Sequence, residues 1–190
     1  MSSSPAPFGE VIGIDSYGIK AYSCNMITKH KQCISVVYKT LFCGIKWQCV
    51  EYVRRWLILT HNITFQQLEM AYMMFTEPYV TFINIITEQR ISYIKYRNGI
   101  VGNLLPKPGS IIVWDKTCGY KTGHVAIVSK ITNKYIYIGE QNWDDCIWNK
   151  PYSRRIPIEY TSCNSVYLND NNEYNLPILG WITLALSIHT

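Results

Sequence analysis

The chain has 190 residues, of which 48% are hydrophobic and 16% are charged. This composition is typical of a globular protein and excludes a disordered chain, and the length favours one domain, residues 1–190, with a single core. The net charge is +5, and the lysines and arginines are scattered along the chain instead of forming a basic stripe. We therefore do not expect a nucleic-acid partner.

The two ends of the chain and its cysteines indicate a cytoplasmic protein. Residues 1–8 lack the basic and apolar regions of a signal peptide, and the apolar segment 176–188 is too short to span a bilayer. The seven cysteines are odd in number and contain no C-x-x-C pair, which argues against a disulfide framework or a zinc site. We expect a reducing environment, no metal or other cofactor, and no membrane partner.

Helical patterns follow an extended, turn-punctuated segment at residues 9–23. Residues 47–61 place their apolar side chains on roughly one side, which predicts a helix. A second helix is predicted for residues 64–75, whose first four residues form a capping box, and a third for residues 80–96.

The pattern changes to short strands after the Pro-Lys-Pro-Gly sequence that ends at Gly109. The predicted strands span residues 110–114, 124–131, 134–142 and 180–187. We interpret residues 144–176 as loops around one short strand. Helices followed by antiparallel strands predict an α+β fold in which the N-terminal helices pack on an antiparallel sheet.

Cys49 lies in the opening turn of the longest predicted helix. Free backbone N–H groups and the positive end of the helix dipole favour the thiolate there, and the same N–H groups can stabilise an oxyanion. A buried cysteine that acts as a small hydrophobic residue is the alternative, and it is the usual role of cysteine.

His124 opens one strand of a predicted hairpin. If the turn is symmetric, His124 lies opposite Asn142, and Glu140 lies on the same face at a diagonal position. A carboxylate at this place can orient the imidazole and stabilise its cation. A register shifted by one residue would present Gln141 and Trp143 instead. The alternative for Glu140 is an exposed charge at a strand end, and the alternative for His124 is an ordinary edge histidine.

Five short blocks, in this order along the chain, resemble the amidase domain of the glutathionylspermidine synthetase/amidase family: residues 6–9, 46–51, 122–127, 140–142 and 178–181. The block Lys-Trp-Gln-Cys-Val-Glu at residues 46–51 is specific to this amidase family and is not shared by CHAP domains in general. That amidase is a CHAP domain of the papain-like superfamily. The resemblance spans nearly the whole chain and implies a papain-like CHAP fold.

The resemblance also implies the chemistry. It assigns Cys49 as the nucleophile, His124 as the general base and then acid, and Glu140 as the orienting carboxylate. It further marks three supporting or substrate-binding positions: Gln48, Arg54 and Asn142. The implied reaction is cysteine-dependent hydrolysis of glutathionylspermidine, or of a related glutathione–polyamine conjugate, through a thioester acyl-enzyme.

Departures from the family leave the substrate open. No counterpart of the family's ATP-grasp synthetase is recognised, so ATP-dependent synthesis is not expected, and residues 24–40 and 144–176 match poorly. One alternative is a CHAP peptidoglycan amidase or endopeptidase, which would use the same residues on another amide. Another is an inactive module that binds glutathione–polyamine conjugates.

Overall fold

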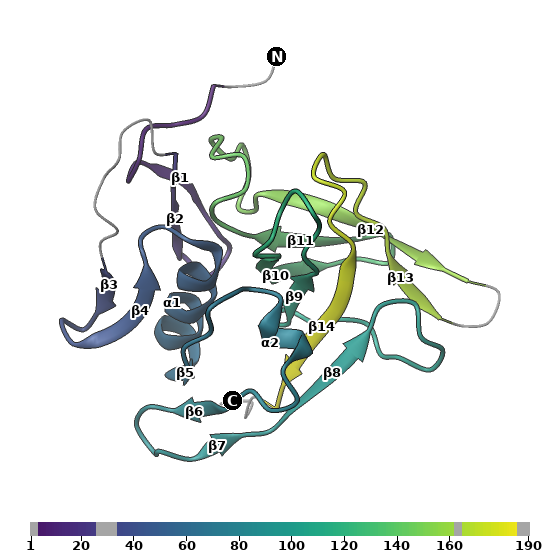
Figure 1. The fold of residues 1–190 in the computed structure, drawn as a ribbon, viewed down its shortest axis with the longest axis horizontal. Helices are drawn as coiled ribbons and strands as arrows, with labels where there is room; N and C mark the ends of the chain where they lie inside the picture. Colours follow the sequence, from purple (N-terminus) through teal and green to yellow (C-terminus); the bar gives the residue numbers. More distant parts are fainter. Residues whose placement is uncertain (1–3, 26–33, 162–164, 186–190) are drawn as a thin grey trace.

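The computed structural model describes residues 4–25, 34–161 and 165–185. Within these ranges the centre of the molecule is a curled, seven-stranded antiparallel sheet with the order β13-β12-β11-β10-β9-β14-β8 (Figure 1). In chain order its strands are β8 (Tyr93–Arg97), β9 (Ile111–Trp114), β10 (His124–Ile131), β11 (Tyr135–Gly139), β12 (Arg154–Tyr160), β13 (Val166–Leu168) and β14 (Ile178–Leu184).

The helix α1 (Cys49–His61) packs against one face of this sheet, alongside β10 (Figure 1). Most of its first ten residues are buried. The helix ends where Asn62 adopts a left-handed conformation with φ 54°, and its N–H group bonds to the carbonyl of Ile58, which is a common way to satisfy the last carbonyls of a helix.

Smaller hairpins surround α1. They are formed by β1 (Val11–Ile14) with β2 (Lys20–Tyr22), by β3 (Ile34–Val37) with β4 (Leu41–Ile45), and by β5 (Ile63–Phe65) with β6 (Phe82–Asn84) and β7 (Arg90–Ile91). A single helical turn, α2 (Met73–Thr76), contacts β14.

Both faces of the central sheet are buried. Because side chains alternate along a strand, Val125 and Ile127 of β10 join the core beneath α1, whereas Ala126 and Val128 join a second core. The second core lies inside the curl of the sheet and includes Trp114. His124, at the start of β10, belongs by this alternation to the second face and lies beside Trp114, with ring centroids 5.3 Å apart.

The α+β fold class is confirmed, as are the long helix and the four predicted strands, with small shifts at their ends. The strand predicted for residues 180–187 is β14, and its last two predicted residues lie outside the described ranges. Among the described residues, Cys24, Cys43, Cys49 and Cys118 are free thiols, and Cys33 and Cys163 lie outside the described ranges. In the described part of the chain, no helix combines the length and apolarity needed to cross a bilayer.

Two predicted helices are wrong. Residues 64–75 begin in β5, whose residues pair with β6, and only α2 is helical there. Residues 80–96 form strands β6 and β7 and most of β8, which pairs along its whole length with β14. Pairing with distant strands outweighed the capping box and the local helical pattern. Residues 144–176 contain two strands, β12 and β13, instead of the single strand predicted.

A buried carboxylate connects the β1–β2 turn to α1. Asp15 is 4% exposed. Its Oδ1 atom accepts hydrogen bonds from the backbone N–H groups of Tyr17 and Ile19, both at 2.9 Å. Its Oδ2 atom accepts from the Tyr52 hydroxyl at 3.0 Å and from Trp56 Nε1 at 2.7 Å.

We expect Asp15→Ala to lower the free energy of unfolding by about 2–4 kcal/mol, because it leaves the buried donors of Tyr52 and Trp56 without an acceptor. Urea denaturation followed by circular dichroism would measure the loss. Glu10→Ala removes an exposed carboxylate from the same hairpin and should change the stability by less than about 0.5 kcal/mol. Equal effects of the two substitutions would contradict the role given to Asp15.

Candidate active site

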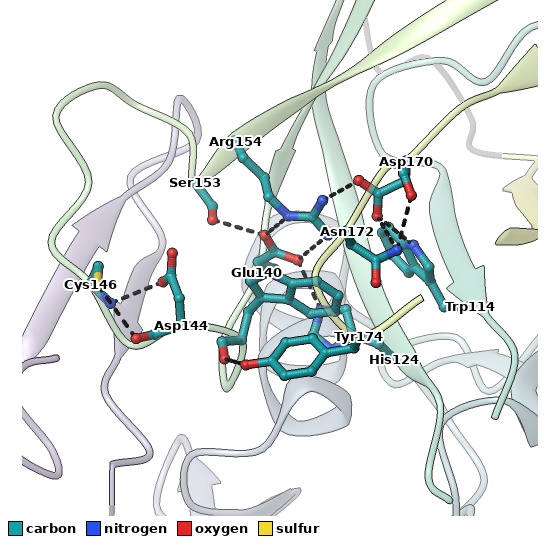
Figure 2. Close-up of polar contacts among 11 residues, drawn as sticks. Trp114, His124, Glu140, Asp144, Cys146, Ser153, Arg154, Asp170, Asn172 and Tyr174 are labelled. Carbon is teal, nitrogen blue, oxygen red and sulfur yellow. Dashed lines mark hydrogen bonds and ion pairs between the residues drawn. The ribbon is translucent and has the colours of Figure 1, made fainter. Parts of the chain in front are cut away.

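The fold brings His124 and Glu140 into direct contact. His124 is the first residue of β10, and Glu140 directly follows β11. At this end of the hairpin Ile127 pairs with Gly139, which is the register predicted from the sequence. His124 Nε2 lies 2.9 Å from Glu140 Oε2 (Figure 2). The predicted contact is therefore present, and the alternative register with Gln141 is not.

Cys49 lies close enough to the His124 ring to act on its protonation. His124 is fully buried, and its Nδ1 atom has no well-formed hydrogen bond within the described residues. Burial lowers the pKa of His124, but the charge of the neighbouring Cys49 sulfur, together with the Glu140 carboxylate, outweighs burial and raises the pKa to about 9. The imidazolium form is thus favoured at neutral pH, beside the first residue of α1.

Glu140 is ionised despite being buried. Besides His124, its carboxylate accepts hydrogen bonds from Arg154 Nε at 2.7 Å, Arg154 Nη2 at 3.3 Å and Ser153 Oγ at 2.9 Å. Burial raises the pKa of Glu140, but the charge of Arg154 and the hydrogen bond from His124 lower it to about 2. A permanent carboxylate of this kind stabilises a neighbouring imidazolium.

The next residue, Gln141, connects the sheet to α1 through side-chain hydrogen bonds. Its Nε2 atom donates to Glu51 Oε2 at 2.9 Å, and its Oε1 atom accepts from Arg55 Nη2 at 3.1 Å. Arg55 Nε also donates to Glu51 Oε1 at 2.7 Å. All three side chains are buried, so this network fixes the helix, and with it Cys49, against the end of β11.

Two of the predicted supporting residues are bonded to each other beside Cys49. Gln48 is the N-cap of α1, and its Oε1 atom accepts a hydrogen bond from Asn142 Nδ2 at 2.8 Å. The Gln48 Nε2 atom donates to Cys24 Sγ at 3.4 Å. The structure therefore places the Gln48 and Asn142 amides next to each other at the start of α1.

Arg54 is held by backbone carbonyls. Its Nη1 atom donates to the carbonyl of Cys43 at 2.6 Å and its Nη2 atom to that of Gln66 at 3.1 Å, and the guanidinium lies 4.2 Å from the Phe65 ring centroid. Burial lowers the pKa of Arg54 to about 10. These bonds give Arg54 a structural role, and its predicted role in binding a substrate carboxylate stays a prediction.

A cavity of about 230 Å³ opens beside Cys49. Its wall includes Cys49 and the three predicted supporting residues, Gln48, Arg54 and Asn142. Apolar and charged side chains complete it, among them Phe42, Leu68, Glu69 and Tyr120. The cavity therefore presents both polar and apolar side chains next to the Cys49 sulfur.

The sequence analysis missed the residues behind Glu140. Ser153 and Arg154 lie in the segment that we interpreted as mostly loops, and so does Asp170, which accepts a hydrogen bond from Arg154 Nη1 (Figure 2). The Arg-Arg pair at residues 154–155 was a visible signal. Without the pairing of β12 with β11, however, nothing connected it to Glu140.

The two shifted pKa values predict how stability depends on pH. The pKa of His124 rises from 6.5 to about 9 on folding, so its contribution is fully present below pH 6.5 and is lost as the pH rises through about 9. The pKa of Glu140 falls from 4.5 to about 2, so its contribution is present above pH 4.5 and is lost as the pH falls through about 2.

We expect the free energy of unfolding to decrease as the pH rises through about 9, where the His124 imidazolium loses its proton, with urea denaturation as the measurement. His124→Gln should flatten most of this decrease. An undiminished decrease in that variant would assign the pH dependence to other groups.

Known proteins match this chain over the region that holds the site. The CHAP domain model matches residues 40–142, more than half of the chain. Trypanothione synthetase from Crithidia fasciculata is 29% identical over 93% of the chain, and the bifunctional glutathionylspermidine synthetase/amidase of Escherichia coli (strain K12) is 27% identical over 95%. The chain spans only 26% and 30% of the lengths of these two relatives. The resemblance seen in the sequence is confirmed, and the chain belongs to the CHAP domain family.

Proposed function

We propose that residues 1–190 form a single amidase domain in which Cys49 is the nucleophile, His124 the general base and acid, and Glu140 the orienting carboxylate. The observation that carries the proposal is the buried His124 imidazole, which bonds to Glu140 at 2.9 Å and interacts with Cys49 on a cavity wall. A nucleophile, a base and an orienting group in this order are the parts that acyl transfer requires.

In the first half of the reaction, the Cys49 thiolate attacks the carbonyl carbon of the amide. The developing oxyanion accepts hydrogen bonds from the unpaired N–H groups of the first turn of α1. The C–N bond breaks when His124 transfers its proton to the leaving nitrogen, which departs as a free amine. A thioester between the acyl group and Cys49 remains.

In the second half, a water molecule attacks the thioester. His124, now neutral, takes one proton from the water and keeps it as the C–S bond breaks, which restores the Cys49 thiolate beside the imidazolium. The products are a carboxylic acid and the free enzyme. Glu140 holds Nε2 throughout, which leaves Nδ1 to exchange the proton with the reacting atoms.

We propose glutathionylspermidine, or a related glutathione–polyamine conjugate, as the substrate. Three relatives are named for glutathionylspermidine, two of them as a synthetase/amidase. A conjugate of this kind carries the glutamyl carboxylate and its α-ammonium group at one end and the ammonium groups of the polyamine at the other, because the glycine carboxylate has formed the amide. The cavity wall contains both a cation, Arg54, and an exposed carboxylate, Glu69, and also the aromatic side chain of Tyr120, which suits such a molecule.

Hydrolysis of glutathionylspermidine, with chromatographic detection of glutathione and spermidine, tests the proposal. Cys49→Ala should abolish the reaction, because no other group supplies the nucleophile. Cys43→Ala is the matched control: burial raises the pKa of this thiol to about 11, so its removal should leave activity in the folded protein. No release of spermidine by the wild-type protein would refute the proposed substrate.

Alkylation tests the nucleophile without a substrate. We expect iodoacetamide near neutral pH to modify Cys49 before Cys118, although Cys118 is exposed and Cys49 is buried, because the imidazolium and the helix dipole favour the thiolate. Peptide mapping by mass spectrometry identifies the labelled cysteine. Labelling of Cys118 first would count against Cys49.

Arg54→Ala tests the carboxylate-binding role. If Arg54 anchors the glutathione end of the substrate, loss of one charge-assisted hydrogen bond of about 1.5–3 kcal/mol should lower kcat/KM about ten- to hundredfold, mainly through KM. Steady-state kinetics are compared with those of Arg97→Ala, which changes an exposed arginine. A lower melting temperature with unchanged kcat/KM would contradict the substrate-binding role and would show that Arg54 acts only through its bonds to the backbone carbonyls.

A further inference from the structure

Arg154 occupies the side of the Glu140 carboxylate that faces away from His124. It donates to both carboxylate oxygens, through Nε to Oε1 and through Nη2 to Oε2 (Figure 2). With His124 on Oε2 and Ser153 on Oε1, the carboxylate accepts four hydrogen bonds. Four donors from three side chains leave a 1% exposed carboxylate little freedom to rotate.

Asp170 fixes Arg154 from behind. One of its carboxylate oxygens accepts a hydrogen bond from Arg154 Nη1. The other accepts from Trp114 Nε1 at 2.8 Å and from Asn172 Nδ2 at 3.2 Å. Because Trp114 is a fully buried residue of β9, Asp170 connects Arg154 to the centre of the sheet.

Packing reinforces the same arrangement. The Arg154 guanidinium lies 4.3 Å from the centroid of the Trp143 ring, and that ring lies 4.7 Å from the His124 ring. The arginine and the imidazole therefore share one aromatic neighbour as well as one carboxylate. A change at Arg154 reaches His124 along two routes, although the two side chains share no direct hydrogen bond among those recorded for the described residues.

On the basis of the proposed function, we propose that Arg154, anchored by Asp170, is a positioning residue that keeps Glu140 ionised and correctly oriented toward His124. A buried carboxylate without a cation takes up a proton in preference to remaining charged. A protonated Glu140 would stabilise the imidazolium far less and could turn its O–H group toward another acceptor. The thiolate–imidazolium pair would then form only at higher pH.

The direction of the effect follows from the charges. Removal of the Arg154 cation removes the main influence that opposes burial and holds the pKa of Glu140 at about 2. Glu140 then protonates within the working pH range, so reactivity that needs its negative charge is lost first at acidic pH. If Arg154 had only a structural role, its replacement would lower stability or reactivity by the same factor at every pH.

The test measures the rate of Cys49 alkylation by iodoacetamide as a function of pH, so no amide substrate is needed. In Arg154→Met we expect the acid limb of the profile to move up by about one pH unit or more, with a rate about tenfold lower near pH 5. Arg154→Lys keeps the charge and should give an intermediate profile. The matched control is Arg155→Met, which alters the neighbouring exposed arginine, whose guanidinium packs on Tyr135, and should leave the profile unchanged.

Two outcomes would overturn the inference: a folded Arg154→Met protein with the wild-type profile, or equal shifts in the Arg154→Met and Arg155→Met proteins. If Arg154→Met does not fold, ¹³C NMR of the wild-type Glu140 carboxyl decides the question, since it should remain a carboxylate down to about pH 4. Titration of Glu140 in the ordinary glutamate range would refute the proposal. Failure of the chain to hydrolyse glutathionylspermidine would refute the proposed substrate and would leave these measurements intact.

Discussion

Two consecutive side chains at the end of β11 connect the two halves of the site. Because successive residues of an extended chain point in opposite directions, Glu140 reaches His124 while Gln141 reaches Glu51 and Arg55 on α1. His124 and the helix that begins with Cys49 are therefore positioned by the same short segment. A shift of one residue would exchange both contacts and place an amide beside the imidazole.

Two buried ion pairs lie where they can fix the position of α1 and of the His124 ring. Glu51 is paired with Arg55 under α1, and Glu140 is paired with Arg154 behind His124. Replacing a buried ion pair by apolar residues often costs no stability, so such pairs are poor evidence of stabilisation. Their geometry is specific, however, because each carboxylate accepts bonds from several fixed donors. The two pairs give the helix terminus and the imidazole defined positions.

Local patterns predicted the parts of the fold that local interactions determine. The helix at residues 49–61 and the β10–β11 hairpin follow from side-chain periodicity and from a short turn. The predicted helix at residues 80–96 failed because β8 gains its partner from β14, more than eighty residues later. Cys49, His124 and Glu140 were identifiable through their motifs. The contact of Arg154 with Glu140 depends on the pairing of β12 with β11, which no sequence motif predicted.

The extent of the family match separates the three proposed catalytic residues from the residues that surround Glu140. The CHAP domain model ends at residue 142, just after Glu140, so it includes Cys49, His124 and Glu140. Arg154 and Asp170, which complete the surroundings of Glu140, lie beyond it. The part of the chain that matches the CHAP domain model therefore holds the three proposed catalytic residues but not the arginine that bonds to the Glu140 carboxylate. In this chain the Glu140 carboxylate is bonded by residues at the start of β12, and the arginine there is held by the segment that leads into β14.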